Sequence, residues 1–451
     1  MKLQKFFKLA IFALALSAFG AACVKEGPPG KDGTNGATGA AGTAGKDANE
    51  TCKMCHTPAK VDIIAVQFQY SKHETGEAAI TESGNAGCSP CHTQGGFQDV
   101  VARKVPSTFT LASTGKYVND YACDVTKAYG ELLCRTCHSS IHETYTSTDL
   151  PKLTSTAAVS LTFLGGKKSV NLTQDNGASN LCIKCHQPRP FTFNNTKNTA
   201  YTGDVLDYAS LASKPTDVFF DGTSAATIAQ AKILPGYRTH THYGTVGAIV
   251  SGTCGIEFTG PMAYAQAVHV TKASCSQCHM ASMVGGTGGH SFNAKGNFAG
   301  CNISGCHTGV TATSAKYWVN PRATIKGLLE QLAAKLKYSG VEFLNRNSDA
   351  TSNLWAGITT NNYDGYLNVY DPATNPTGQS MNPGQFQNAS PAATWTAEQK
   401  AYNLTLPVLK ISNAQFGAII NFQLCLREYS LGIHNLDYSK ALLTNSLAII
   451  P

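Results

Sequence analysis

The sequence lacks arginine-rich runs, and it lacks any apolar run long enough to cross a lipid bilayer. Charged residues make up only 14% of the 451 residues, and the formal net charge is +7. No basic stretch is interleaved with stacking residues, so this charge does not argue for nucleic acid as a partner. The length and the 42% apolar content allow substantial buried cores, and we expect a globular chain with attachments.

The first 22 residues hold the one long apolar run. Lys2, Lys5 and Lys8 accompany "LAIFALALSAFGAA", which is typical of a secretory signal peptide and too short for a spanning helix. Cys23 stands where this run ends, the position at which bacterial lipoproteins are cleaved and acylated. Gly20 replaces the leucine that such signals usually carry. Lipid attachment at Cys23 and ordinary cleavage therefore both stay open.

Glycine recurs at every third position from Gly27 to Asp47, in seven Gly-X-Y triplets. Only one triplet carries proline and the run is short, which favours a flexible tether over a trimeric collagen-like stalk. We expect a signal peptide over residues 1–22 and a lipid-attachment cysteine with a tether over residues 23–50.

Cysteine decides the class of protein. Of 16 cysteines, 12 fall into the units "CKMCH", "CSPCH", "CRTCH", "CIKCH", "CSQCH" and "CNISGCH". In CxxCH two thiols add to the two vinyl groups of a haem, and the adjacent histidine binds its iron. Zinc sites and redox dithiols are the alternatives, but neither explains a histidine after every second cysteine. The predicted cofactors are six covalently attached haem c groups. The attachment cysteines are Cys52, Cys55, Cys88, Cys91, Cys134, Cys137, Cys182, Cys185, Cys275, Cys278, Cys301 and Cys306, and the proximal ligands are His56, His92, His138, His186, His279 and His307.

Seven further histidines face the six predicted irons. They are His73, His142, His240, His242, His269, His290 and His434. This number suffices for a second histidine at every iron, with one to spare. His142 follows His138 by four residues on the same helical face, so it would ligate a neighbouring haem. His240 and His242 are two residues apart, and we expect one ligand and one surface or propionate-contacting residue.

Local sequence adds two expectations. His290 follows the flexible "VGGTGG", and we expect it to reach the iron of Cys301 and Cys306. Met280 and Met283 lie too close to His279 to reach the opposite face of the same ring, so they should pack against a porphyrin.

These motifs resemble those of multihaem c-type cytochromes. "QYSKHETG", "HYGTVGAIVSGTCGIEFTG", "CHM" followed by "GGHSF", and "SLGIHNLDYSKALL" resemble strings of the broad group that contains cytochrome c554, the octahaem reductases and pentahaem nitrite reductase. The resemblance covers roughly residues 50–310 and the last 40. It implies bis-histidine haems, and it favours His242 as a ligand and His240 as the spare. The lysine that replaces the motif histidine in nitrite reductase is absent.

The expected fold class is mainly α with extensive loops, with haems packed against one another in a cytochrome domain over residues 51–310. Short helices are expected at the motifs, and residues 202–222 should form a loop-rich excursion. A C-terminal helical region should follow over residues 311–451 and return His434 to the haems. Its helices are predicted from Asn320 to Gly340, over 414–429 and from Asn435, with an exposed polar stretch and some hairpin over 345–394. Cys123 and Cys254 could form a disulfide, and Cys425 would then be a cysteine without a disulfide partner.

Filled axial positions leave no site for a substrate, so we expect electron transfer along the haems. The chain would be extracytoplasmic, as an outer-membrane or cell-surface lipoprotein or as a periplasmic or secreted protein. It would exchange electrons with other redox proteins or an extracellular acceptor. The alternative is an oxidoreductase acting on nitrite, hydroxylamine or a sulfur oxyanion at one five-coordinate haem. A subunit of a cytochrome filament is a lesser alternative, and the oligomeric state cannot be read from the sequence.

Overall fold

The computed structural model describes residues 58–75, 81–106, 109–111, 117–139, 152–191, 206–346, 363–373 and 384–451. The chain divides into two compact units, Met1–Lys53 and Met54–Pro451, and every described residue belongs to the second. The signal peptide, Cys23, the tether, the first motif and His142 lie outside the described residues. No described helix is both long enough and apolar enough to pass through a bilayer.

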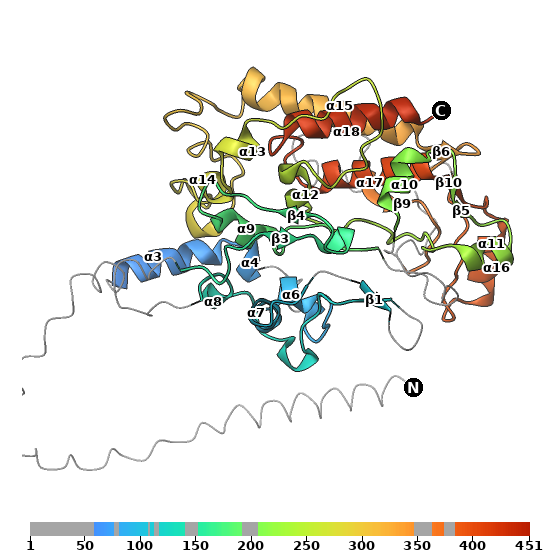
Figure 1. Ribbon diagram of the computed structural model, residues 1–451, viewed down its shortest axis with the longest axis horizontal. Helices are drawn as coiled ribbons and strands as arrows, with labels where there is room; N and C mark the ends of the chain where they lie inside the picture. Colours follow the sequence, from blue (N-terminus) through green and yellow to red (C-terminus); the bar gives the residue numbers. More distant parts are fainter. Residues whose placement is uncertain are drawn as a thin grey trace, which may run out of the picture. The chain divides into compact units, whose positions relative to one another are not determined.

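Three helices near the C-terminus form the centre of the main core. They are α15 (Asn320–Lys335), α17 (Asn413–Arg427) and α18 (Leu436–Ile449), which contact one another (Figure 1). All three were predicted from the sequence, and this part of the prediction is confirmed. The first helix ends earlier than expected, because Gly340, at a φ of 79°, serves the turn between two short strands rather than the helix end.

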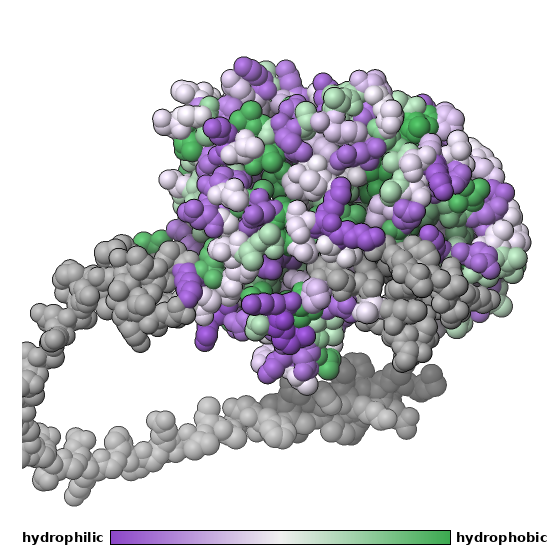
Figure 2. All heavy atoms as spheres, in the orientation of Figure 1, coloured by the Kyte–Doolittle hydropathy of each residue, from purple (hydrophilic) through white to green (hydrophobic). Residues whose placement is uncertain are grey.

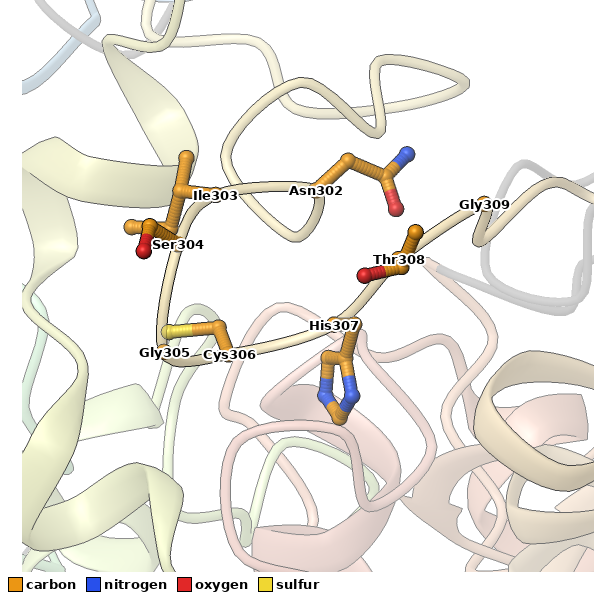
Figure 3. A pocket seen from close by; sticks show the side chains of 8 residues that line it. All are labelled: Asn302, Ile303, Ser304, Gly305, Cys306, His307, Thr308 and Gly309. Atoms are coloured by element: carbon orange, nitrogen blue, oxygen red, sulfur yellow. The ribbon is translucent and has the colours of Figure 1, made fainter.

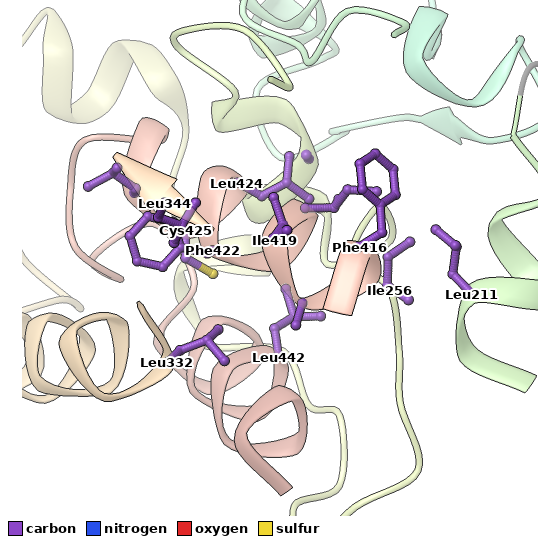
Figure 4. Close-up of a cluster of buried hydrophobic side chains, with 14 of the residues drawn as sticks. Leu211, Ile256, Leu332, Leu344, Phe416, Ile419, Phe422, Leu424, Cys425 and Leu442 are labelled. Carbon is purple, nitrogen blue, oxygen red and sulfur yellow. The ribbon is translucent and has the colours of Figure 1, made fainter. Parts of the chain in front are cut away.

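Helix α17 is buried around almost its whole circumference. Every residue of it except Gln415 is buried, including Phe416 and Phe422 (Figure 4). A helix with apolar residues around most of its circumference is covered on all sides, and its buried polar residues, such as Asn421, find hydrogen-bond partners there. Helices α10 (Tyr208–Ser213) and α12 (Val246–Ser251) contact it in addition to α15 and α18.

The remaining described helices are mostly short, which agrees with a mainly α class with extensive loops. They are α3 (Pro58–Gln69), α4 (Lys72–Thr75), α6 (Ser89–His92), α7 (Gln94–Ala102), η1 (Val125–Lys127), α8 (Cys134–Cys137), η2 (Thr162–Leu164), α9 (Ala178–Ile183), α11 (Ala225–Gln230), α13 (His269–Lys272), α14 (Cys275–His279), η3 (Gly289–Ser291), η4 (Ala315–Val319) and α16 (Ala397–Thr405).

The described strands pair only in antiparallel twos. The pairs are β1 (Phe109–Leu111) with β2 (Tyr117–Asn119), β3 (Val159–Ser160) with β4 (Ser169–Val170), β5 (Val218–Asp221) with β10 (Lys410–Ser412), β6 (Lys337–Tyr338) with β7 (Val341–Glu342), and β8 (Leu344–Arg346) with β9 (Tyr363–Leu367). The β5–β10 pair joins segments almost 200 residues apart, and its register places Ile411 opposite Phe220.

Two sequence expectations about loops were wrong. The excursion over residues 202–222 contains α10 and β5, and it contributes Leu211 and Phe220 to the main core. In the stretch 345–394 the expected hairpin agrees with the antiparallel β8–β9 pair, but the expected exposure is wrong for the described residues Leu367 and Phe386, which lie in that core. An isolated apolar residue in a polar segment produces no helical periodicity, so the sequence does not reveal it as a core residue. Such a residue can still be buried when its segment is extended.

The main core draws on both sides of residue 310, from Val159 to Ile450. On the face seen in Figure 2, hydrophobic residues appear as small separate groups among hydrophilic ones. The long helices therefore share this core with segments on both sides of residue 310, among them Ile183 of the fourth motif, while Val100, Tyr121, Cys123 and Ala128 form a separate small cluster.

Asn421 joins three segments inside this core. Its carboxamide accepts a hydrogen bond from the Ile256 backbone N–H (2.8 Å) and donates to the Ile256 carbonyl (2.8 Å) and to Ser446 Oγ (2.9 Å). Asn421 is fully buried, so no water replaces it. It fixes the segment after α12 against α17 and α18.

The change Asn421→Ala should destabilise the fold by about 2–4 kcal/mol, because it leaves both backbone groups of Ile256 buried without partners. Thermal or denaturant unfolding measures this loss. Asn320→Ala is the matched control: Asn320 is exposed, and its change should alter stability by less than about 0.5 kcal/mol. Equal effects of the two changes would contradict this role of Asn421.

Candidate functional site

Four of the five described motifs lie on or at the end of short helices. Helix α6 carries the end of "CSPCH", α8 carries most of "CRTCH", α9 enters "CIKCH" and α14 spans "CSQCH". In α6 and α14 the motif histidine is the last helical residue. The prediction of short helices at the motifs is therefore confirmed for these four and wrong for "CNISGCH", which lies in turns and bends.

Two classes of cysteine differ in burial. All ten described motif cysteines are partly or fully exposed, whereas Cys123, Cys254 and Cys425 are buried. Cys123 belongs to a small cluster with Val100 and Tyr121, and Cys254 belongs to the main core. Both thiols are free, so the disulfide considered from the sequence is not formed. Two cysteines in separate cores cannot approach to disulfide distance.

Histidine rings meet in pairs. The ring centroids of His73 and His186 are 6.0 Å apart, as are those of His92 and His242 and those of His269 and His307, while those of His279 and His434 are 6.2 Å apart. Each pair joins one motif histidine to one histidine outside the motifs. The partners are far apart in sequence except for His269 and His307.

This spacing has a simple chemical reading. Two imidazoles on opposite sides of one metal ion, each bound through a nitrogen at about 2 Å, hold their ring centroids roughly 6 Å apart. The planes of the His279 and His434 rings are inclined by 17°, whereas the planes of the other three pairs are inclined by 72° to 86°. The described residues contain no cluster of three or more histidine, cysteine or acidic side chains arranged for one ion. The rings come together in twos.

His290 and His138 form a fifth neighbouring couple. Burial lowers the pKa of His290, and the nearby His138 lowers it further. The sequence expectation had His290 at the motif of Cys301 and Cys306, but there His269 faces the motif histidine, His307. The glycine-rich segment before His290 allows many backbone conformations, but it does not determine which motif His290 contacts. This explains the error.

His240 is held differently from the paired histidines. Its Nδ1 accepts a hydrogen bond from the His242 backbone N–H (2.9 Å) and lies 2.5 Å from a guanidinium nitrogen of Arg427. Its ring centroid is also 6.2 Å from that of His242, so ring spacing alone does not identify a pair. Burial, and then the charge of Arg427, lowers the pKa of His240 to about 2. The ring is anchored in the protein and faces no motif histidine.

The second nitrogen of several paired rings is anchored. Nδ1 of His279 lies 2.8 Å from the Phe292 carbonyl, and Nδ1 of His269 lies 2.7 Å from the Ile433 carbonyl. A carbonyl only accepts, so each Nδ1 carries the proton and Nε2 keeps its lone pair. Metal-binding histidines are usually oriented by such a hydrogen bond on the far nitrogen.

Electrostatics keeps most of these rings neutral. Burial lowers the pKa of His242 to about 3, with a further contribution from Arg189. Burial also lowers the pKa of His186 to about 4. The nearby rings of His73, His279, His434 and His92 lower the same pKa further. Neutral imidazole is the form that binds a metal ion. Because His186 is influenced by members of three pairs, these pairs lie close to one another.

The motifs also contact one another directly. The Cys91 thiol lies 3.7 Å from the Lys184 carbonyl oxygen, which joins the second and fourth motifs. The Cys275 N–H donates to Ser179 Oγ at 2.9 Å, just before the fourth motif. The Gln277 side chain lies 3.6 Å from Cys306 Sγ, which joins the fifth and sixth motifs.

The third motif borders the fourth. A hydrogen bond to Cys275 and burial raise the pKa of Cys182, and Cys137 contributes to this increase. The contacts therefore run from the second motif through the fourth and fifth to the sixth, with the third beside the fourth.

The sixth motif curves around a cavity of about 540 Å³ lined by residues 302–309. Figure 3 shows Cys306 and His307 together on one arm of this loop, with Asn302 and Ile303 on the other. The His307 ring lies 4.4 Å from that of Tyr317, centroid to centroid.

Glu428 was not predicted from the sequence, and its carboxylate lies 2.5 Å from Nδ1 of His434. Arg427 was not predicted either, and its fully buried guanidinium contacts His240. Two adjacent charged residues at the end of a mostly apolar helix could have indicated them, but this signal predicts neither partner.

No family model, curated protein or solved structure matches this chain.

Gly300 lets the fifth and sixth motifs approach each other. A Cβ added to it would lie 2.8 Å from Cα of Cys278 and closer still to the Gln277 carbonyl oxygen. These are backbone atoms of a motif helix, which cannot move aside independently. The close approach of the two motifs therefore requires glycine at this position.

Gly300→Ala should destabilise the protein by about 1–3 kcal/mol through this overlap. Gly327→Ala is the control, because Gly327 lies in α15 with open space around its Cα, and alanine there should stabilise the helix by about 0.5–1 kcal/mol. Unfolding midpoints of the two variants measure the difference. A neutral Gly300→Ala would show that the two motifs are not closely apposed.

Proposed function

We propose that this chain is a multihaem c-type cytochrome that carries electrons, with six covalently bound haems, each ligated by two histidines. The observation that carries the proposal is the pairing of motif histidines with distant histidines at the separation of two ligands of one metal ion. A haem bound in this way supplies one-electron iron chemistry with both axial positions filled.

The described residues fit such groups. Each described motif offers two cysteines that are partly or fully exposed beside a histidine, and two of the paired histidines present a nitrogen with a free lone pair because the other nitrogen is anchored. The proposed axial pairs are His92 with His242, His138 with His290, His186 with His73, His279 with His434, and His307 with His269. His56 and His142 lie outside the described residues, and we propose them as the pair of the first motif.

The contacts between motifs support an order of electron transfer. The described sites would follow one another from the second motif through the fourth and fifth to the sixth, with the third joining at the fourth. The fourth motif would then be a branch point, because His186 lies within electrostatic reach of members of three pairs. Electrons could enter or leave at more than one end of this array.

The cellular setting of the proposal comes from the sequence. The signal segment, Cys23 and the glycine-rich tether favour an extracytoplasmic protein held at a membrane by a lipid. Its partners would be other redox proteins or an extracellular electron acceptor, and nothing in the sequence favours nucleic acid.

Alkylation of the unfolded, reduced protein tests covalent attachment. Thioether bonds block a cysteine, so only Cys123, Cys254 and Cys425, together with any unacylated Cys23, should be labelled. Peptide mass spectrometry identifies the labelled residues. Those non-motif cysteines are the internal control, because they should react fully once the protein is unfolded. Labelling of the 12 motif cysteines would reject the proposal in favour of zinc or a redox dithiol.

His73→Leu tests the axial pairs. It should leave one iron with a single axial histidine, which changes one of six haems from low to high spin and allows it to bind carbon monoxide. Electronic and EPR spectra with and without carbon monoxide measure the change.

His240→Leu is the matched control, because this buried ring faces no motif histidine. It should leave the spin states unchanged. High-spin haem that binds carbon monoxide in the unaltered protein would instead favour the oxidoreductase alternative.

A further inference from the structure

Glu428 lies at the C-terminal end of α17 with its side chain fully buried. Its carboxylate accepts hydrogen bonds from Ser430 Oγ (2.6 Å) and from the Gly432 backbone N–H (2.9 Å). A third partner is Nδ1 of His434, at 2.5 Å. Three donors converge on one buried carboxylate, so its charge is held in a fixed place.

The position of this charge is specific to one histidine pair. Glu428 contacts Nδ1 of His434, and the other face of that pair is His279, whose own Nδ1 lies against the Phe292 carbonyl. Nδ1 of His269 likewise lies against a carbonyl, that of Ile433. A carboxylate attracts the Nδ1 proton more strongly than a neutral carbonyl does.

The surroundings of Glu428 do not cancel its effect on the ring. Arg322 of α15 interacts electrostatically with Glu428 from a longer distance. Among the described residues, His434 is the basic group whose nitrogen lies within 4.0 Å of the Glu428 carboxylate. The carboxylate and the ring thus form one tightly coupled unit.

We propose that Glu428 is a positioning residue that lowers the reduction potential of the haem site formed by Cys275, Cys278, His279 and His434. This inference rests on the proposed function. A carboxylate behind His434 increases the electron density that the ring donates, which stabilises the ferric over the ferrous iron. The site takes up one electron from a neighbouring redox centre when it is reduced, and no other bond is formed or broken.

The consequence depends on where this site lies. The fifth motif contacts both the fourth and the sixth, so electrons moving between those two would pass through it. A site of lower potential at that position makes this step uphill, and it separates the sixth site energetically from the others.

Glu428→Gln removes the charge and keeps an oxygen that can accept from Nδ1. One of the six haems should become easier to reduce by at least about tenfold in its redox equilibrium, which is 59 mV for one electron. A potentiometric titration followed by visible absorption measures the shift. EPR identifies the haem, because nearly parallel ring planes, found here at 17°, give a different low-spin signal from perpendicular ones.

Glu342→Gln is the matched control. Glu342 is also a buried glutamate, but it pairs with Arg346 and contacts no histidine, so all six potentials should stay unchanged. An unshifted potential in Glu428→Gln, or an equal shift in Glu342→Gln, would overturn the inference.

Ser430→Ala serves if Glu428→Gln does not fold, since glutamine offers fewer acceptors to three donors. Removing the Ser430 hydroxyl, which donates to the same oxygen as His434, leaves the carboxylate more basic toward the ring. The same haem should then become harder to reduce. A shift in the other direction, or none, would contradict the proposal.

The two proposals fail in different ways. If Cys275 and Cys278 react with the alkylating reagent in the unfolded protein, no haem is attached there and the proposed function itself fails. If Cys275 and Cys278 are blocked and Glu428→Gln leaves the reduction potential of that haem unchanged, only the proposed role of Glu428 is wrong.

Discussion

Contacts between histidine rings from distant segments connect the described motifs to the rest of the chain. Four described motif histidines each lie ring to ring with an imidazole outside the motifs. His92 meets His242 and His279 meets His434, each across about 150 residues of sequence. These contacts hold short helices and loops that have little regular structure of their own beside the long C-terminal helices.

The long C-terminal helices provide the rigid part of this arrangement. Helix α17 is buried between α15, α18 and α12, and the chain that leaves it turns through Glu428 to His434. Rigid elements hold a ligand more exactly than a free loop does. Asn421 and Tyr438 extend the same attachment to the segment after α12, where they bind the backbone of Ile256 and Gly255.

The sequence allowed prediction of the features that repeat along the chain or show helical periodicity. The helix from Asn320 was predicted because its apolar residues recur at helical spacing, and the paired histidines were named because motifs and free histidines could be counted. The partners could not be predicted, as His290 shows, since the approach of two distant segments depends on packing around Ser179 and Gly300 that no local pattern encodes. Glu428 was missed for the same reason: nothing in "REYSLGIH" shows that the chain folds back on itself.

The two classes of cysteine give the folded chain a chemical selectivity that its sequence lacks. Burial raises the pKa of Cys254 to about 11 and raises that of Cys425 still further, so these thiols are both covered and protonated. Burial also raises the pKa of Cys88, Cys137 and Cys278 to about 11, but the ten described motif cysteines are partly or fully exposed. Any reagent or enzyme acting on the folded chain thus distinguishes them by packing, and the thiols without a neighbouring histidine are protected from modification by the cores that they help to fill.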